Sequence, residues 1–421
     1  MTDSKVPIKI FSDIQSPRLN YVLDFIFTEK GLAFELTNDI NSKHDLAYTK
    51  LKTGAKLLLL PCGMLSEAGV SKNWNIEFNS GNNIWTVNGE LDDLAIIFYF
   101  LSRYEEYTDE KRDEIGRYSA NQSLLYKAQQ LHQPWGDILV KNIWKKLGLN
   151  TLLLEKQYKT ILTYDIDIAW AYLHKPVWRT TANILKELLN PKALKERMTV
   201  LREKKNDPYD SYDRIKENAK RHETVLFFLL GDYGKLDKNH SWKNANLQSL
   251  IQSFINSAKL GIHPSFNSFL KIEKIIEETE RLGSITGMET ILSRQHYLRM
   301  TWPESMQILQ KAGITHDYTM GYADHYGFRA STSFSFHFFD LTTNSKKPLK
   351  IVPFAFMDGT LKDYMKLNPK DAINIILDLK KTVKSVGGQF IPLWHNHSIG
   401  NQMEWRDWQI VYEACLDKNQ T

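Results

Sequence analysis

Short apolar runs alternate with amphipathic segments along most of the chain, and the alternation is most regular after residue 158. Runs rich in β-branched and aromatic residues predict strands at 160–167, 222–230, 261–265, 284–292, 314–319, 349–355 and 389–394. Apolar stripes at helical spacing predict helices at 181–189, 247–260, 269–282, 302–312, 369–386 and 405–416. This repeated alternation is typical of an α/β barrel or a parallel sheet, in which reactive groups gather at the carboxyl ends of the strands.

The first 150 residues predict a smaller α/β unit. Strands are expected at 7–13, 32–36 and 55–60, and helices at 18–30, 92–104 and 135–149. We therefore divide the chain into an N-terminal α/β domain of unknown role at 1–152 and a second domain at 153–421. The first domain contains no phosphate-binding loop. We interpret its charged residues as a solvated or domain-interface cluster, namely Arg103, Glu105, Glu106 and Arg117. In the second domain the basic segment 191–213 reads as an irregular surface insertion.

Composition narrows the class of protein. The chain has 421 residues, of which 42% are hydrophobic and 24% charged, which is the balance of a globular protein with a large core. A net charge of +5 spread over this length is too weak to indicate nucleic acid or a membrane surface. The two cysteines, Cys62 and Cys415, exclude a disulfide scaffold and favour a reducing compartment. No apolar run is long enough to span a bilayer, and the N-terminus does not read as a signal peptide, so we expect a cytoplasmic protein.

An acidic pair follows the strand predicted at residues 160–167. Asp165 and Asp167 are separated only by Ile166, so in an extended chain both carboxylates leave the same face. Two like charges so close to an apolar run need an offsetting partner, which a bound cation or an arginine supplies. Taken alone, this short and common pattern favours a strand that ends in a solvated acidic turn.

Other polar residues follow the later predicted strands. His263 and Asn267 are four residues apart, a spacing that places them on one face of a helical turn. Arg294 can pair with a carboxylate and keep it ionised. Asp317 follows a further strand, and His395 follows the last one. A histidine in that position can act as a general acid.

The order of these motifs resembles the polysaccharide deacetylases, the NodB-type carbohydrate esterases. The resemblance covers roughly residues 158–400 and rests on D-x-D, H-x-x-x-N, an arginine, an aspartate and L-W-H, each at a predicted strand end. It implies a distorted, partly open (β/α) barrel and a bacterial subgroup in which an extra domain precedes the barrel. It also implies a hydrolase that acts on carbon–nitrogen bonds other than peptide bonds and removes acetyl groups from a sugar or polysaccharide.

The resemblance also implies a role for each residue. Asp165 would be the general base, and His395 would protonate the leaving amine. Asp167, His263 and Asn267 would hold a divalent metal, with Zn²⁺ expected and Co²⁺, Ni²⁺ or Mn²⁺ as alternatives. Arg294 would orient Asp165, and Asp317 would tether His395. The expected partner is a carbohydrate substrate; nucleic acid and a membrane span are not expected.

This sequence departs from the family pattern at three places. The acidic pair is D-I-D rather than two adjacent aspartates, the arginine segment lacks the usual proline, and Asn267 stands where a second histidine is usual. An amide oxygen is a poorer ligand for zinc than an imidazole. The alternative is therefore a catalytically impaired carbohydrate-binding or glycan-assembly protein on the same barrel. A glycosidase that pairs Asp165 or Asp167 with Asp317 is a third hypothesis, but it leaves both histidines without a role.

Overall fold

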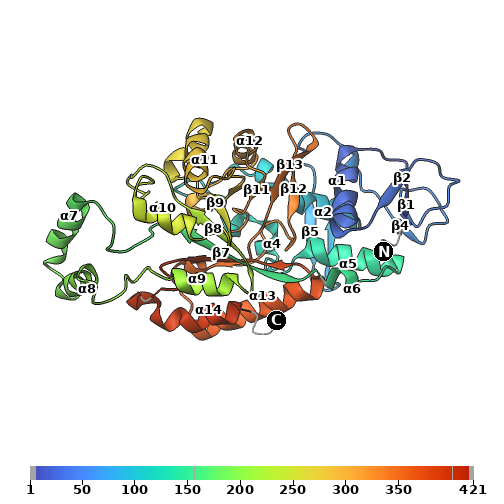
Figure 1. The fold of residues 1–421 in the computed structure, drawn as a ribbon. Coiled ribbons are helices and arrows are strands. Elements are labelled where there is room, and N and C mark those ends of the chain that lie inside the picture. Colours follow the sequence, from blue (N-terminus) through green and yellow to red (C-terminus); the bar gives the residue numbers. More distant parts are fainter. Residues whose placement is uncertain (1–5, 156, 401, 417–421) are drawn as a thin grey trace.

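The apolar strands and amphipathic helices assemble into a mixed α/β structure (Figure 1). We analysed a computed structural model, which describes residues 6–155, 157–400 and 402–416. Its largest sheet has ten strands, nine of them in the order β12-β13-β11-β10-β9-β8-β7-β16-β14, with β15 also paired to β7. The strands are β7 (Lys159–Ile166), β8 (Glu223–Phe228), β9 (Lys259–Ile262), β10 (Leu292–Ser293), β11 (His316–Asp317), β12 (Phe336–Asp340), β13 (Ser345–Ile351), β14 (Phe356–Met357), β15 (Gln389–Phe390) and β16 (Pro392–His395).

All neighbours in this sheet run parallel except β12 and β13. β12 and β14 are its two ends, so the described strands form an open sheet and no closed barrel. The helices of this region are α7 (Val177–Glu187), α8 (Pro191–Leu201), α9 (Tyr212–Ala219), α10 (Ala245–Gln252), α11 (Ile272–Thr286), α12 (Glu304–Lys311), α13 (Pro369–Val386) and α14 (Gln409–Cys415). None of the described helices has the length and apolar character that crossing a membrane requires.

The N-terminal region contains two small sheets. A parallel sheet has the order β2-β1-β3-β4, and β5 pairs with β6 as a hairpin. The elements are β1 (Ile8–Ser12), α1 (Pro17–Ile26), β2 (Phe34–Thr37), β3 (Leu46–Tyr48), β4 (Leu57–Leu59), β5 (Ile76–Asn79), β6 (Ile84–Val87), α2 (Asp93–Leu101), α3 (Tyr104–Thr108), α4 (Leu124–Lys127), α5 (Trp135–Leu147) and α6 (Leu152–Glu155).

The N-terminal region packs directly against the edge of the large sheet. The hydroxyl of Tyr21 on α1 donates to the backbone carbonyl of His337 at 2.7 Å, and the Tyr21 ring lies 5.0 Å from the ring of Phe339. One continuous hydrophobic core includes buried residues of both regions. Burial of this apolar surface holds the two regions together.

Two expectations about secondary structure are wrong. Residues 191–213 are not irregular, because they contain α8 and the start of α9. The strand expected at 284–292 is almost absent, since α11 continues to Thr286 and β10 begins only at Leu292. Its C-cap is Gly287, which adopts φ 72°, a left-handed conformation that favours glycine, whereas Gly283 lies within the helix.

Candidate metal centre

Five polar side chains gather at the carboxyl ends of adjacent parallel strands. Asp165 lies near the end of β7, and its register partner on β16 is His395. Asp167 follows β7, His263 follows β9 and Arg294 follows β10. Because these strands are parallel, their carboxyl ends meet at one edge of the sheet, which brings together residues that are up to 230 positions apart.

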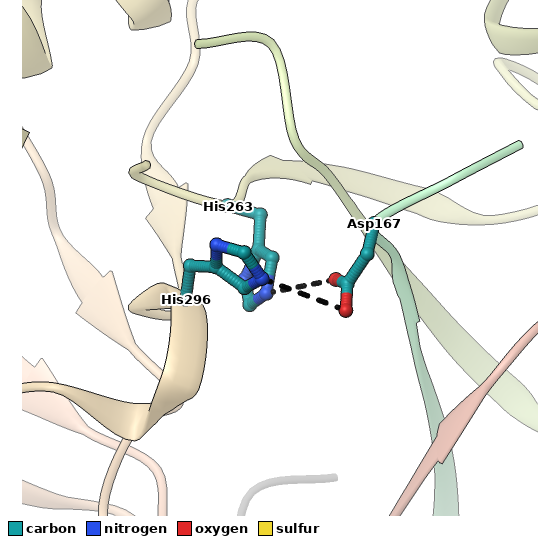
Figure 2. A group of neighbouring side chains, drawn as sticks. All are labelled: Asp167, His263 and His296. Carbon is teal, nitrogen blue, oxygen red and sulfur yellow. Dashed lines mark ion pairs between the residues drawn. The ribbon is translucent and has the colours of Figure 1, made fainter. Parts of the chain in front are cut away.

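Asp167, His263 and His296 converge on one point (Figure 2). One ligand atom from each lies within 4.8 Å of the other two. The Nε2 atom of His263 is 3.2 Å from Asp167 Oδ1, and the Nε2 atom of His296 is 3.6 Å from Asp167 Oδ2. Two imidazoles and a carboxylate are the ligand set of many catalytic zinc sites, which leave a further position open.

Hydrogen bonds to the other ring nitrogens orient both imidazoles. His263 Nδ1 donates to the backbone carbonyl of Arg294 at 2.5 Å, and His296 Nδ1 donates to Asp237 Oδ1 at 2.9 Å. With the proton on Nδ1, each neutral ring turns the lone pair of Nε2 toward Asp167. Asp237 is itself held by the backbone N–H groups of Phe266 and Asn267. This second layer of contacts is typical of metal-binding histidines.

The electrostatics of the three side chains fit a divalent cation. Asp167 Oδ1 is a buried oxygen without a hydrogen-bond partner in the described part of the chain. Burial alone would raise the pKa of Asp167, but His296 and His263 lower it well below its usual range. Burial would lower the pKa of His296, but Asp167 and Asp237 raise it to about 9. A cation at this point would take the place of that proton and satisfy the unpaired oxygen.

Asp165 lies beside this triad and is held by Arg294. Both residues are buried, and Arg294 Nη1 donates to Asp165 Oδ1 at 2.9 Å. The other guanidinium nitrogens donate to Thr163 Oγ1 and to the backbone carbonyl of Tyr318, which fixes the guanidinium in place. Asp165 Oδ2 remains 3.8 Å from His263 Nε2. The carboxylate is therefore charge-paired on one oxygen and faces the metal triad with the other.

His395 approaches the triad from β16, with Asp358 behind it. His395 Nδ1 donates to Asp358 Oδ1 at 2.8 Å, and its backbone N–H donates to Asp358 Oδ2 at 2.8 Å. The other ring nitrogen, Nε2, lies 3.7 Å from Asp167 Oδ2. Burial alone would lower the pKa of His395, but Asp358 raises it to about 10. A protonated imidazole therefore faces the site at neutral pH, as a general acid must.

Two of the predicted site residues, Asn267 and Asp317, do not make the contacts that their expected roles require. Asn267 is not among the residues that line the pocket of the triad, and its side-chain amide lies against Gly234 instead. The prediction that Asp317 tethers His395 is wrong, because Asp358 occupies that position. Asp317 is fully buried and accepts hydrogen bonds from Ser293 and Thr319, so it fastens the ends of β10 and β11.

Sequence reasoning missed two functional side chains, His296 and Asp358. His296 stands two residues after Arg294, and Asp358 opens an Asp-Gly pair after the short apolar run 351–357. A histidine close to a predicted strand end is a better candidate zinc ligand than an asparagine, so residue type alone favours His296 over Asn267. Asp358 could have been found in the sequence as an aspartate that directly follows an apolar run.

The centre opens into a pocket of about 160 Å³ with walls from both regions of the chain. Tyr297, Met357 and Tyr364 line it beside the metal triad, and Arg117 enters from the N-terminal region. Arg117 Nε donates to Asp113 at 2.7 Å, and Nη1 donates to the backbone carbonyl of Tyr297 and to the hydroxyl of Tyr364. Arg117 is therefore part of the pocket wall rather than a solvated surface charge.

Residues 8–151 match the model of one protein family, DUF7033, which is described as a family of unknown function. No curated protein matches the sequence.

Similar solved structures exist at low identity. One, assigned as a polysaccharide deacetylase from Mycobacterium smegmatis, aligns with 62% of this chain and 85% of its own at 13% identity and a TM-score of 0.40. PuuE allantoinase aligns over the same shares at 13% identity and a TM-score of 0.39. A 4-alpha-glucanotransferase from Thermococcus litoralis aligns with 61% of this chain and 36% of its own at 13% identity and a TM-score of 0.36. These proteins carry out different reactions, so the function of this chain is argued from its own site.

Proposed function

We propose that the protein is a metal-dependent hydrolase that removes an acetyl group from a sugar or glycan. One observation carries the proposal: a complete Asp-His-His donor set lies beside both a charge-paired carboxylate, Asp165, and a protonated imidazole, His395. The motif order that resembles the polysaccharide deacetylases supports the same reaction. The hypothesis of a catalytically impaired protein rested on the missing second histidine at position 267, and His296 supplies that second imidazole.

The side chains divide the reaction between them. A divalent cation held by Asp167, His263 and His296 would supply Lewis acidity, which lowers the pKa of water and polarises a carbonyl group. Asp165, held in place by its ion pair with Arg294, accepts the proton of the attacking water. His395 gives its proton to the leaving nitrogen or oxygen as the bond to the acetyl carbon breaks, and Asp358 stabilises the imidazolium until then. The products are acetate and the free amine or hydroxyl.

The alternative glycosidase reaction pairing Asp165 or Asp167 with Asp317 has less support. Such an enzyme needs a second carboxyl group that reaches the substrate. Asp317 is fully buried, and its two oxygens accept three hydrogen bonds. It cannot serve as that second carboxyl group without losing these contacts.

Replacing the general base tests the proposal. For Asp165→Asn we expect kcat on an N-acetylated or O-acetylated sugar to fall by about 10²–10⁴-fold, because the amide accepts no proton. Bound metal, measured by elemental analysis after dialysis, should stay near the wild-type amount. The matched control is Asp324→Asn, a carboxylate whose contacts are to the Ala120 backbone and which does not line the metal pocket. Full activity of Asp165→Asn would contradict the assignment.

Arg117 provides a second test of the pocket. We expect Arg117→Ala to raise KM about tenfold with little change in kcat, because the guanidinium can donate to substrate oxygens but lies outside the metal triad. Arg112→Ala is the control, since Arg112 stacks on Tyr118 and does not line the pocket. A fall in kcat with unchanged KM would show that Arg117 acts on the chemical step instead.

A further inference from the structure

We propose that the helical hairpin formed by α7 and α8, residues 175–205, docks the protein on an anionic lipid bilayer. Figure 1 shows α7 and α8 standing away from the sheets and from the other helices. The hairpin is joined to the rest of the chain by residues that follow β7, so it emerges on the same side of the sheet as the metal centre.

The outer face of α7 is apolar and exposed. Trp178 and Leu185 are seven residues apart and lie along one face of α7, and Leu189 follows in the turn that ends the helix. Their exposed fractions are 61%, 66% and 94%. Val177 and Leu188 are also exposed beside them. An exposed, contiguous apolar face of this kind indicates an interaction surface.

The hairpin contacts the rest of the protein through its opposite, inner face. Arg197 on α8 pairs with Glu187 on α7 through two hydrogen bonds, at 2.6 and 2.7 Å, and stacks over the ring of Tyr172. Val200 is buried between the helices and the base. Arg179 donates to the backbone carbonyls of Lys238 and Asn239. The hairpin is therefore held in place through its other face. On the outer side, Trp178 meets the ring of Tyr233 with one edge and stays largely exposed, as do the leucines of this face.

Charge identifies the occupant of this face. Residues 175–205 carry nine basic and three acidic side chains, a net charge of +6, whereas the whole chain carries +5. The rest of the molecule therefore has a net charge of −1, and the positive charge that looked weak over the full length is concentrated here. Lysine and arginine around an apolar helix face are the features of helices that lie in the interface of an anionic membrane.

A second copy of the chain is a poorer occupant. In a two-fold dimer the same patch meets itself, which would bring two hairpins of +6 together. Nucleic acid would match the charge but would leave Trp178, Leu185 and Leu189 without an apolar environment. Of these three occupants, the anionic lipid surface is the one that accommodates both features of the hairpin.

The base of the hairpin also connects to the metal centre. Arg179 is bound by the carbonyls of Lys238 and Asn239, and the neighbouring Asp237 orients His296. A hairpin seated on a membrane would therefore be linked through residues 237–239 to a side chain of the metal centre. This link favours a substrate whose glycan is attached to a lipid, a consequence that depends on the proposed function, whereas membrane binding does not.

Vesicle sedimentation with the full-length protein tests the proposal without any measure of activity. We expect binding to vesicles of phosphatidylcholine mixed with phosphatidylglycerol, and at least about tenfold weaker binding to phosphatidylcholine alone. Leu185→Ser/Leu188→Ser/Leu189→Ser should weaken binding at least about tenfold, because three exposed apolar side chains no longer insert. Lys192→Glu/Lys195→Glu should also weaken vesicle binding, and this effect should be larger at low salt than at high salt.

Matched variants on α13 and in the N-terminal region show whether the loss of any exposed leucine or lysine weakens vesicle binding, or only the loss of those on the hairpin. Leu60→Ser/Leu91→Ser/Leu377→Ser removes three leucines elsewhere that are each at least half exposed, and Lys370→Glu/Lys381→Glu changes the charge of exposed lysines on α13. Both controls should bind vesicles like the wild type. The proposal is overturned by three results: no binding to anionic vesicles, equal binding to neutral ones, or binding that the hairpin variants do not change. Dimerisation abolished by the triple serine variant would instead identify a second copy as the occupant.

Discussion

Replacing His296 with alanine is expected to remove the metal. The variant loses one of the three proposed protein ligands and leaves Asp237 with only its two backbone hydrogen-bond donors, Phe266 and Asn267. Loss of a residue that only orients a ligand typically costs 10–100-fold in metal affinity, so loss of the ligand itself should cost more than about 100-fold. Elemental analysis after dialysis should find about one metal ion per wild-type chain and almost none in His296→Ala. Deacetylation should fall with the metal content.

Asn267→Ala is the matched control, because the sequence motif alone assigns Asn267 to this ligand position. Its backbone N–H, which the substitution keeps, makes the contact to Asp237. We therefore expect metal content within about twofold of the wild type. If Asn267→Ala loses the metal and His296→Ala keeps it, the ligand set deduced from the structure is wrong.

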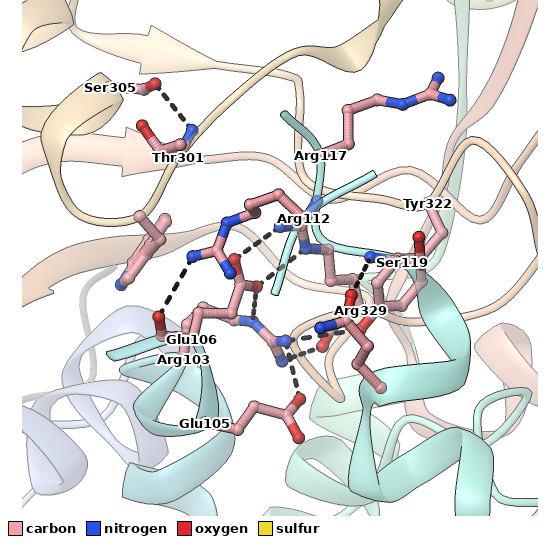
Figure 3. Close-up of polar contacts among 12 residues, drawn as sticks. Arg103, Glu105, Glu106, Arg112, Arg117, Ser119, Thr301, Ser305, Tyr322 and Arg329 are labelled. Carbon is pink, nitrogen blue, oxygen red and sulfur yellow. Dashed lines mark hydrogen bonds and ion pairs between the residues drawn. The ribbon is translucent and has the colours of Figure 1, made fainter. Parts of the chain in front are cut away.

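Glu106→Gln is expected to produce the largest loss of stability. Glu106 lies fully buried between Arg103 and Arg329 and accepts hydrogen bonds from both, with the shortest at 2.6 Å (Figure 3). Arg329 belongs to the C-terminal region, so this pair joins the two regions of the chain. Removing one partner of a buried ion pair costs about 3–5 kcal/mol, because the other charges stay buried without compensation. Urea unfolding at pH 7 measures the loss, and Glu280→Gln on the exposed face of α11 should leave the midpoint unchanged.

The same carboxylate predicts how the loss depends on pH. Burial alone would raise the pKa of Glu106, but Arg329 and Arg103 lower it from 4.5 to about 2. A lowered pKa in the folded state means that the contribution is complete above pH 4.5 and disappears as the pH falls through 2. The difference in stability between the wild type and Glu106→Gln should therefore shrink between pH 5 and pH 2. A difference that grows on acidification would contradict this account.

Much of the candidate site could be predicted because a buried strand is marked by a short apolar run of neighbouring residues in the sequence. The apolar run before Asp165 marks a buried strand, and parallel strands bring their carboxyl ends to one edge. Asp165, Asp167, His263, Arg294 and His395 were therefore identified from their places after predicted strands, and the structure brings all five together. The large α/β sheet could be predicted for the same reason.

The remaining assignments depend on elements too short to show a period. β10, β11 and β14 have two residues each, so no alternation reveals which side chains after them face the pocket. His296 follows β10 and Asp358 follows β14, and the sequence motif placed Asn267 and Asp317 in their roles instead. Arg117 was assigned to a solvated or domain-interface cluster, and the sequence did not show that its contacts in the other region are Tyr297 and Tyr364. Such contacts between distant segments come only from tertiary structure.

Anomalous diffraction from crystals of the wild-type protein grown with Zn²⁺ or Co²⁺ would test the metal centre most directly. The account predicts one strong peak per chain, about 2.0–2.2 Å from Asp167 and from the Nε2 atoms of His263 and His296. Asp165 and His395 should flank the peak without binding it. A peak at any other place, or a ligand set that contains Asn267 in place of His296, would contradict the account.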